Sequence, residues 1–263
     1  MILAIDIGNT NIVLGCVEQG NIISTARMNT DIHKTEYEYA VAMREILCFR
    51  GVDCASFEGA ILSSVVSQLT DVMKKAIRML IGKPVLVVGK GIKTGLDMRI
   101  DDPGQVGADL VVGAVACLAL YTPPLIFIDM GTATKLFALN EKGQFVGGVI
   151  APGLRISMEA LSGGTSQLPH ISLEAPKKCI GTNTVDCMRS GAMLGTAAML
   201  DGMIERMEEE LGCRAAVIAT GGYASSVIPL CRREIILNEE LLLQGLSVLW
   251  EKNRRIDRKE TAM

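Results

Sequence analysis

The sequence predicts an α/β protein made of two copies of one domain, with a cleft between the copies. The first observation is a repeat: "AIDIGNTNIVLGCVEQG" at residues 4–20 resembles "FIDMGTATKLFALNEKG" at residues 127–143. An ungapped superposition pairs Asp6 with Asp129, Gly8 with Gly131, Thr10 with Ala133 and Gly20 with Gly143. The second observation is that strand and helix patterns follow each segment in the same order. Chance similarity of two Asp-x-Gly hairpins is the alternative, and the shared order of the later elements favours duplication.

Length and charge narrow the class of protein. The 263 residues, 49% of them hydrophobic, suit one large or two modest domains, and we place the division between residues 1–118 and 119–263. A net charge of −3 with five Phe, four Tyr and one Trp argues against a nucleic-acid surface. No apolar run approaches the roughly 18 residues that a membrane span needs. The amino-terminal "MILAIDIG" reads as a strand and not as a secretory signal.

Eight cysteines occur without a CxxC pair. Several lie in apolar runs such as "VACLAL", which favours buried, reduced thiols over disulfides or a zinc site. Reduced thiols and the lack of a signal sequence predict a cytoplasmic protein.

In the first half, a meander of three strands precedes alternating helices and strands. The meander is predicted at "LAIDIG", "NIVLGCVEQG" and "NIISTARM". "TEYEYAVAMREILCFRG" has helical periodicity and ends at Gly51. The half continues with a buried strand "EGAILSSVV", a helix "SQLTDVMKKAIRMLIG", a strand "KPVLVVG" and a long helix that begins near Pro103.

The second half repeats this order. Its strands are predicted at "LIFIDMG", "TKLFALNEKG" and "QFVGGVIAPG", followed by a helix "LRISMEALSGG". A loop with "QLPHISLEAP" leads to the longest helix, residues 184–211, on which small and flexible apolar residues form a stripe suited to close packing. A buried strand "RAAVIATGG" and a helix "NEELLLQGLSVLWEKN" follow, and we expect "RRIDRKETAM" to be a mobile tail.

The repeated Asp-x-Gly turn has the chemistry of a phosphate-binding loop. A strand that ends in "IDIGNTN" places a carboxylate at its tip, and Gly8 allows the backbone to approach a ligand. The N–H groups of the turn and the Thr10 hydroxyl can hold phosphate oxygens, while Asp6 can hold magnesium directly or through water. An ordinary hairpin also tolerates Asn-Thr-Asn. Two copies that face a cleft, however, favour binding of the ATP phosphates. The later "IATGG" would suit a flat adenosine lying on backbone.

The motifs taken together resemble the type III pantothenate kinases, over nearly the whole chain. They are "DIGNTN", "DDPGQVGADL", "DMGTATK", "GGVIAPG", "GTNT" with the following "MRSG", and "ATGG". The resemblance implies duplicated ribonuclease-H-like domains, as in actin-like ATPases and sugar kinases, with an interdomain cleft. It implies transfer of a phosphoryl group from ATP to pantothenate, giving 4'-phosphopantothenate, the first step of coenzyme A biosynthesis. A homodimer with the substrate site near its interface is also implied.

Site residues follow from this resemblance, position by position. Asp109 would be the catalytic base, although an acid that favours the helix dipole is the alternative. Thr184 would reach pantothenate, a role compatible with a helix N-cap. Asp129 would hold a monovalent cation, K⁺ or NH₄⁺, and Asp6 would hold magnesium. The residues that would contact ATP are Asp6, Ile7, Gly8, Asn9, Thr10, Asn11, Ile12, Val13 and Thr132. The other residues that would contact the acceptor are Gly107, Ala108 and Leu110.

Two positions depart from the family's pattern. Leu110 stands where the family has arginine, which removes a charged partner for the substrate. Lys135 stands where the family has threonine, and we predict that its ammonium folds back toward Asp129 and replaces the monovalent cation. A solvated strand lysine is the alternative. These departures keep two other functions open: a kinase-like paralogue that binds nucleotide or pantothenate in regulation, and a kinase for another small acceptor.

Overall fold

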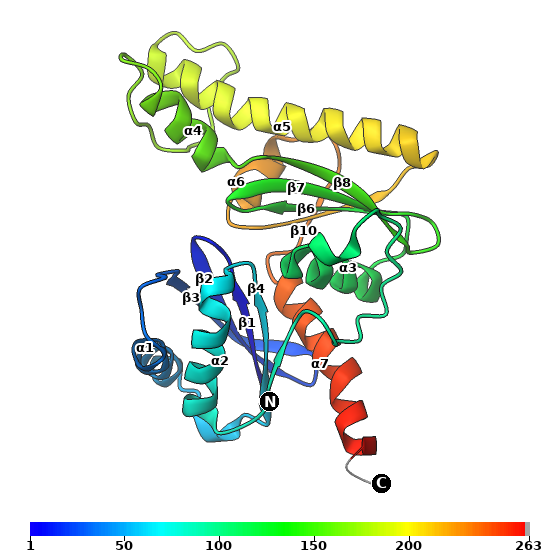
Figure 1. Cartoon of the computed structure of the whole chain (residues 1–263). Coiled ribbons are helices and arrows are strands. Elements are labelled where there is room, and N and C mark those ends of the chain that lie inside the picture. The colour runs from blue at the N-terminus through cyan, green and yellow to red at the C-terminus, as the bar shows by residue number, and fades with distance from the viewer. Residues whose placement is uncertain (261–263) are drawn as a thin grey trace. The chain divides into compact units, whose positions relative to one another are not determined.

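Two five-stranded sheets of the same topology form the framework of the protein (Figure 1). The computed structural model describes residues 1–260, with side chains through residue 254. The chain divides into two compact units. The first contains Met1–Leu96, Asp102–Ala119 and the chain from Glu240 onward; the second contains Asp97–Asp101 and Leu120–Glu239.

The sheet of the first unit has the strand order β3-β2-β1-β4-β5. Strand β1 is antiparallel to β2 and parallel to β4. The elements are β1 (Ile2–Ile7), β2 (Asn11–Glu18), β3 (Asn21–Asn29), α1 (Glu36–Phe49), η1 (Cys54–Ser56), β4 (Gly59–Ser64), α2 (Ser67–Ile81), β5 (Val85–Val87), η2 (Pro103–Gln105), α3 (Ala108–Leu120) and α7 (Leu241–Glu260).

The sheet of the second unit has the order β8-β7-β6-β9-β10, with the same sequence of parallel and antiparallel pairs. This match confirms the predicted duplication. The elements are β6 (Leu125–Met130), β7 (Ala133–Leu139), β8 (Phe145–Pro152), α4 (Leu154–Gly163), α5 (Thr184–Leu211), β9 (Ala216–Thr220), α6 (Ala224–Val227), η3 (Ile228–Leu230) and β10 (Ile236–Leu237). Helix α5 has the predicted bounds, whereas α6 and the two-residue strand β10 were not predicted.

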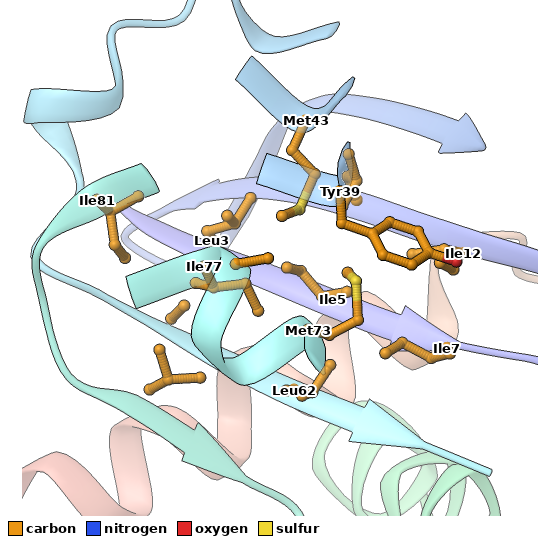
Figure 2. Close-up of a cluster of buried hydrophobic side chains, with 14 of the residues drawn as sticks. Leu3, Ile5, Ile7, Ile12, Tyr39, Met43, Leu62, Met73, Ile77 and Ile81 are labelled. Atoms are coloured by element: carbon orange, nitrogen blue, oxygen red, sulfur yellow. The ribbon is translucent and has the colours of Figure 1, made fainter. Parts of the chain in front are cut away.

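Alternate residues of β1 enter two different cores, because successive side chains of a strand point to opposite faces. Leu3, Ile5 and Ile7 pack with Tyr39 of α1 and Met73 of α2 (Figure 2). The other face of the sheet packs against α3 and α7, with a core made of Ile2, Ala4, Ile61, Val112, Val115, Leu246 and Trp250. Asp6 follows Ala4 by two residues and therefore belongs to the α3 and α7 face.

The last helix departs from the predicted division at residues 118 and 119, which assigned it to the second half. Helix α7 packs on the sheet of the first unit, where glycines allow close approach. A Cβ on Gly59 would lie 2.2 Å from Cη2 of Trp250, and one on Gly245 would lie 2.3 Å from the carbonyl oxygen of Val112. The helix runs to Glu260, so residues 254–260 continue it and do not form the predicted tail, whereas residues 261–263 lie outside the described part.

Helix α3 also begins later than predicted. Pro103 opens the short turn η2, in which the Asp102 side chain accepts a hydrogen bond from the Gly104 N–H. Val106 is extended, with φ −69° and ψ 127°, which separates this turn from the helix that starts at Ala108. The prediction missed this break because the apolar periodicity begins only after the turn.

The second unit has its own core. One face of its sheet packs against α5, with Ile126, Ile128 and Met130 of β6 meeting Met193 and Ala197. The opposite face carries a stack of Phe127, Phe137 and Phe145, with ring centroids 6.0 and 5.2 Å apart. Among the residues described, no helix is both long and apolar enough to cross a membrane.

Candidate functional site

The β1–β2 turn of the first unit is held in place by its own backbone and by Thr30. The Gly8 N–H donates to the Asn11 carbonyl at 2.9 Å. At the end of β3, the Thr30 hydroxyl donates to the Gly8 carbonyl at 2.7 Å and its N–H donates to the Thr10 carbonyl at 3.0 Å. The side chains of Asn9 and Thr10 are exposed. The turn is therefore a fixed loop with accessible polar groups, placed directly after Asp6.

Asp109 lies in the first turn of α3, also in the first unit, and is only 8% exposed. Its Oδ1 accepts the Leu110 N–H at 2.8 Å. A Cβ on Gly107 would lie 2.5 Å from that same oxygen and 3.8 Å from Cγ1 of Val65. Gly107 therefore leaves room for the carboxylate. It also connects the start of α3 with the end of β4, the strand beside β1.

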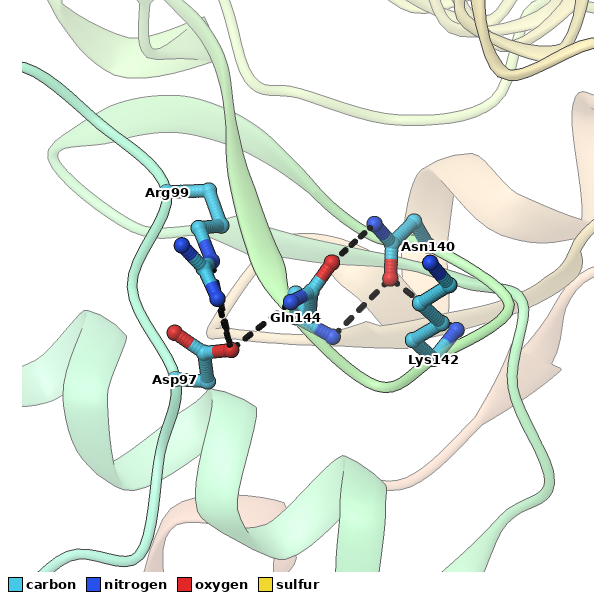
Figure 3. Close-up of polar contacts among 5 residues, drawn as sticks. All are labelled: Asp97, Arg99, Asn140, Lys142 and Gln144. Atoms are coloured by element: carbon cyan, nitrogen blue, oxygen red, sulfur yellow. Dashed lines mark hydrogen bonds and ion pairs between the residues drawn. The ribbon is translucent and has the colours of Figure 1, made fainter.

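The remaining acceptor residues of this segment differ in exposure. Gly107 and Ala108 are half-buried, so their backbone lies near the surface of α3's first turn. Leu110 is 6% exposed, which makes it a core side chain. The Nε and Nη2 of Arg99 donate to Asp97, which also accepts from Gln144 (Figure 3). The Gln144 hydrogen bond, and next Arg99, hold the pKa of Asp97 below its usual value.

In the second unit, Lys135 and Asp129 form an ion pair. They are opposite one another in the β6–β7 register, and Nζ lies 2.8 Å from Oδ2. Both side chains are largely buried, at 16% and 12% exposed. The predicted contact is therefore present. Because both side chains are so little exposed to solvent, removing one of them would leave the charge of the other poorly compensated.

The two turns differ by one residue, which corrects the ungapped superposition. Gly8 donates to Asn11, three residues ahead, whereas Gly131 donates to Ala133, two residues ahead. Thr10 therefore corresponds to Thr132 and not to Ala133, since each threonine precedes the acceptor of the turn. After the turn, the register pairs Asp6 with Val13 and Asp129 with Lys135. The structure thus places the lysine where the first copy has valine.

Other backbone packs closely against the second turn. A Cβ on Gly153 would lie 2.2 Å from the Thr132 carbonyl oxygen, so only glycine fits there. Gly221 follows β9 with φ +101°, and its Cβ position lies 2.5 Å from the Met130 nitrogen. The glycines of the "APG" and "ATGG" motifs therefore let neighbouring backbone pack closely against the loop that contains Thr132. The predicted contact of the "IATGG" segment with adenosine stays a prediction.

Thr184 is the first residue of α5 and is exposed. The N-cap is Asn183, whose side-chain oxygen accepts the Asp186 N–H at 2.9 Å. Thr184 is thus free of the capping role that was its alternative. It lines a groove of about 700 Å³ between α4, α5 and the end of β8, together with Leu154, Met158, Cys187, Gly195 and Met199.

One polar residue beside the first turn was missed in the sequence. Ser63 of β4 lies opposite Asp6 in the parallel β1–β4 pair, and its hydroxyl is completely buried. Aligning "LAIDI" with "AILSS" as neighbouring strands would have revealed it, but the pairing partner of β1 is not evident from the sequence.

Within residues 1–254, no three His, Cys, Asp or Glu side chains are grouped so that they could hold a metal ion. All eight cysteines are free thiols. A divalent cation at Asp6 would therefore take further ligands from outside a cluster of such side chains. Magnesium commonly binds in this way, through one or two carboxylates, substrate phosphates and water. A carboxylate followed by a fixed glycine turn fits that mode.

Comparison with known proteins identifies the family. A family model described as type III pantothenate kinase matches residues 2–206. The type III pantothenate kinase of Moorella thermoacetica is 41% identical over 96% of this chain and 100% of its own length. That of Halalkalibacterium halodurans is 40% identical over the same shares.

The fold comparison agrees. Component A of the (R)-2-hydroxyglutaryl-CoA dehydratase of Acidaminococcus fermentans superimposes with a TM-score of 0.56 at 14% identity, covering 95% of this chain and 96% of the other. Together with the paired sheets, this confirms the predicted duplicated ribonuclease-H-like fold of the actin-like ATPases. The predicted cleft between the units stays a prediction. The chain belongs to the type III pantothenate kinase family.

Proposed function

We propose that this chain transfers the γ-phosphoryl group of ATP to the primary hydroxyl of pantothenate and forms 4'-phosphopantothenate, the first step of coenzyme A biosynthesis. The observation that carries the proposal is about 40% identity to type III pantothenate kinases over their full length. The geometry of the first unit supports it, since a fixed phosphate-type turn and the carboxylate of Asp109 both belong to that unit.

Phosphoryl transfer depends on positioning and charge stabilisation more than on covalent chemistry. In our proposal, residues 6–13 and Thr132 bind ATP, and N–H groups of the first turn hold phosphate oxygens. Asp6 holds magnesium, which neutralises phosphate charge when bound. Asp109 accepts the proton of the pantothenate hydroxyl as that oxygen attacks the γ-phosphorus of ATP and ADP leaves. Gly107, Ala108, Leu110 and Thr184 position the acceptor.

Lys135 takes the place of the monovalent cation in this proposal. Its ammonium lies 2.8 Å from Asp129, where the family resemblance implies K⁺ or NH₄⁺. A fixed charge and a diffusible cation would both neutralise Asp129 beside the Thr132 turn. We therefore infer that this chain needs no potassium.

We also propose a homodimer with the acceptor site near its interface. The groove along α5 supports it, because its lining is largely apolar and it includes Thr184. Small residues in the groove, such as Gly191 and Gly195, would allow a second helix to approach closely. The cytoplasmic location stays a prediction from the cysteines.

A second candidate function rests on Leu110. A buried leucine offers no charge to the pantothenate carboxylate, which favours an acceptor without that group. A regulatory paralogue that binds ligand without turnover is a third. The second function would show turnover with a different acceptor. The third would show ligand binding without turnover.

The test is ATP-dependent phosphorylation of pantothenate by the purified full chain with magnesium, beside Asp109→Asn and the matched control Asp101→Asn. We expect turnover by the wild type, a loss of about 100-fold or more in kcat for Asp109→Asn, and no change for the exposed Asp101. Wild-type binding of ATP without turnover would favour the regulatory paralogue. Full turnover by Asp109→Asn would exclude Asp109 as the base.

A further inference from the structure

Within the described part of the chain, the hydroxyl of Ser63 makes no hydrogen bond that would stabilise the fold. Its side chain is fully buried, and its hydroxyl has no hydrogen-bond partner among the described residues. The neighbouring Ser64 is different, because its hydroxyl both donates to the Val66 carbonyl and accepts the Val66 N–H, each at 3.1 Å. A buried hydroxyl without a partner costs stability, and such groups in native proteins call for an explanation.

The register places this hydroxyl beside Asp6. Ser63 is the partner of Asp6 in the parallel β1–β4 pair. Neighbouring residues of a parallel pair point to the same face of the sheet. Two residues earlier, Ala4 and Ile61 enter the core beneath α3 and α7, so Asp6 and Ser63 share that face, toward which the first turn of α3 also lies.

The second unit has a hydroxyl at the same position. Thr220 is the partner of Asp129 in the parallel β6–β9 pair and is 2% exposed. The residues before each hydroxyl are apolar in both strands: Ala60, Ile61 and Leu62 in β4, and Val217, Ile218 and Ala219 in β9. A hydroxyl beside the carboxylate near the end of the central strand is therefore a feature of both copies.

We propose that Ser63 is a positioning residue for Asp6: its hydroxyl donates a hydrogen bond to the Asp6 carboxylate when metal and nucleotide are bound. The bond would fix one carboxylate oxygen and direct the other toward the cation. Carboxylates that ligate metals are commonly held by such a second hydrogen bond. The Ser63 hydroxyl would then lack a partner in the ligand-free chain and gain one, the Asp6 carboxylate, when the ligands bind. The inference rests on the proposed function, because it assumes a divalent cation at Asp6.

The experiment measures metal binding directly. Mn²⁺ is titrated into the full chain with a non-hydrolysable ATP analogue, and free Mn²⁺ is followed by electron paramagnetic resonance. We expect Ser63→Ala to weaken Mn²⁺ binding about 10-fold, within the range seen when such partners are removed. In kinetics, the Mg²⁺ concentration for half-maximal rate should rise by a similar factor, with kcat recovered at saturating Mg²⁺.

Thermal unfolding without ligands separates this role from a structural one. Ser63→Ala removes a buried, unpaired hydroxyl and should melt at the wild-type temperature or above it. The control Ser64→Ala breaks two hydrogen bonds and should melt lower, with Mn²⁺ affinity unchanged. Should Ser63→Ala misfold, Ser63→Cys replaces the hydroxyl with a somewhat larger group that is a weak donor, and it should show the same loss of affinity.

Three outcomes would overturn the inference. Unchanged Mn²⁺ affinity in a folded Ser63 variant would show that the hydroxyl does not act on Asp6. A fall in kcat at saturating Mg²⁺ with unchanged metal affinity would assign Ser63 another role. Failure of the wild type itself to bind Mn²⁺ with the analogue would remove the proposed metal site at Asp6, and this inference with it.

Discussion

The ammonium of Lys135 lies 2.8 Å from the Asp129 carboxylate, across the β6–β7 pair of the second unit. In the first unit the corresponding pair is Asp6 and Val13. The two copies have thus kept the carboxylate at the end of the central strand and diverged in the residue opposite it. In the proposed reaction, Lys135 neutralises Asp129, and Asp6 is the carboxylate that would hold magnesium.

Potassium independence is the first prediction. Wild-type turnover should be the same in Na⁺ and K⁺ buffers, because Lys135 already neutralises Asp129. Lys135→Thr restores the residue of the family and should become dependent on K⁺ or NH₄⁺. Kinetic assays at constant ionic strength check both, with the exposed Lys142→Thr as the matched control.

Thermal unfolding gives this prediction a second measurement. Lys135→Thr leaves the Asp129 charge only 12% exposed and without its cation, so its melting temperature should fall. Adding K⁺ in place of Na⁺ should restore part of the loss in the variant and leave the wild type unchanged. A strict K⁺ requirement in the wild type would contradict the role of Lys135.

The second prediction is that the enzyme discriminates only weakly between acceptors with and without the pantothenate carboxylate. A hydrogen bond to a charged group contributes about 1.5–3 kcal/mol, and Leu110 cannot supply it. Panthenol, which has an alcohol in place of the carboxylate of pantothenate, should therefore be phosphorylated with kcat/KM within about 10-fold of pantothenate. Parallel assays with both acceptors check this. A preference for pantothenate above about 100-fold would mean that another cation of the chain recognises the carboxylate.

The third prediction concerns the groove on α5. Gly195 lines it, and a Cβ added there would meet no atom within 4 Å. Gly195→Glu should therefore leave the fold intact but place a charge in the proposed interface, which should convert dimer to monomer in sedimentation velocity. Ala198→Glu, at an exposed position of α5 that does not line the groove, should remain dimeric. A monomeric wild type would refute the proposed dimer.

The sequence predicted the repeated hairpin well, because an Asp-x-Gly turn after a buried strand has a local signature. It could not predict what depends on the partner of a segment. Periodicity identified the helix of α7 but not the sheet on which Trp250 packs. Nothing in the sequence distinguishes Ser63 from other serines near the end of a strand, because its place beside Asp6 depends on the pairing of β4 with β1. The one-residue difference between the turns was hidden by a compensating difference further along, so Gly20 still matched Gly143.

The same limit applies to the cysteines. The apolar runs around several of them favoured buried thiols, yet Cys48, Cys179 and Cys187 are exposed. A sequence pattern cannot show which face of a helix is covered, and Cys187 lies on the groove side of α5.

Thiol reactivity therefore provides the fourth prediction. Burial raises the pKa of Cys16 to about 11 and that of Cys117 to about 12, from an ordinary 9.0. A raised pKa keeps the neutral thiol in the folded state, so these groups favour the folded state below pH 9, and that contribution is lost as pH rises from about 9 toward 12. At pH 8, iodoacetamide should alkylate Cys48 and Cys179 while Cys16 and Cys117 stay unmodified until urea unfolds the chain. Peptide mass spectrometry measures each site.

Cys187 connects thiol reactivity to the proposed dimer. If a second copy covers the groove, Cys187 should react more slowly than Cys179 in the wild type, although both are exposed in the single chain. Gly195→Glu should raise the rate at Cys187 and leave Cys179 unchanged, because only Cys187 lines the groove. Equal rates at Cys187 in the wild type and the variant would place the interface elsewhere, even if the wild type sediments as a dimer.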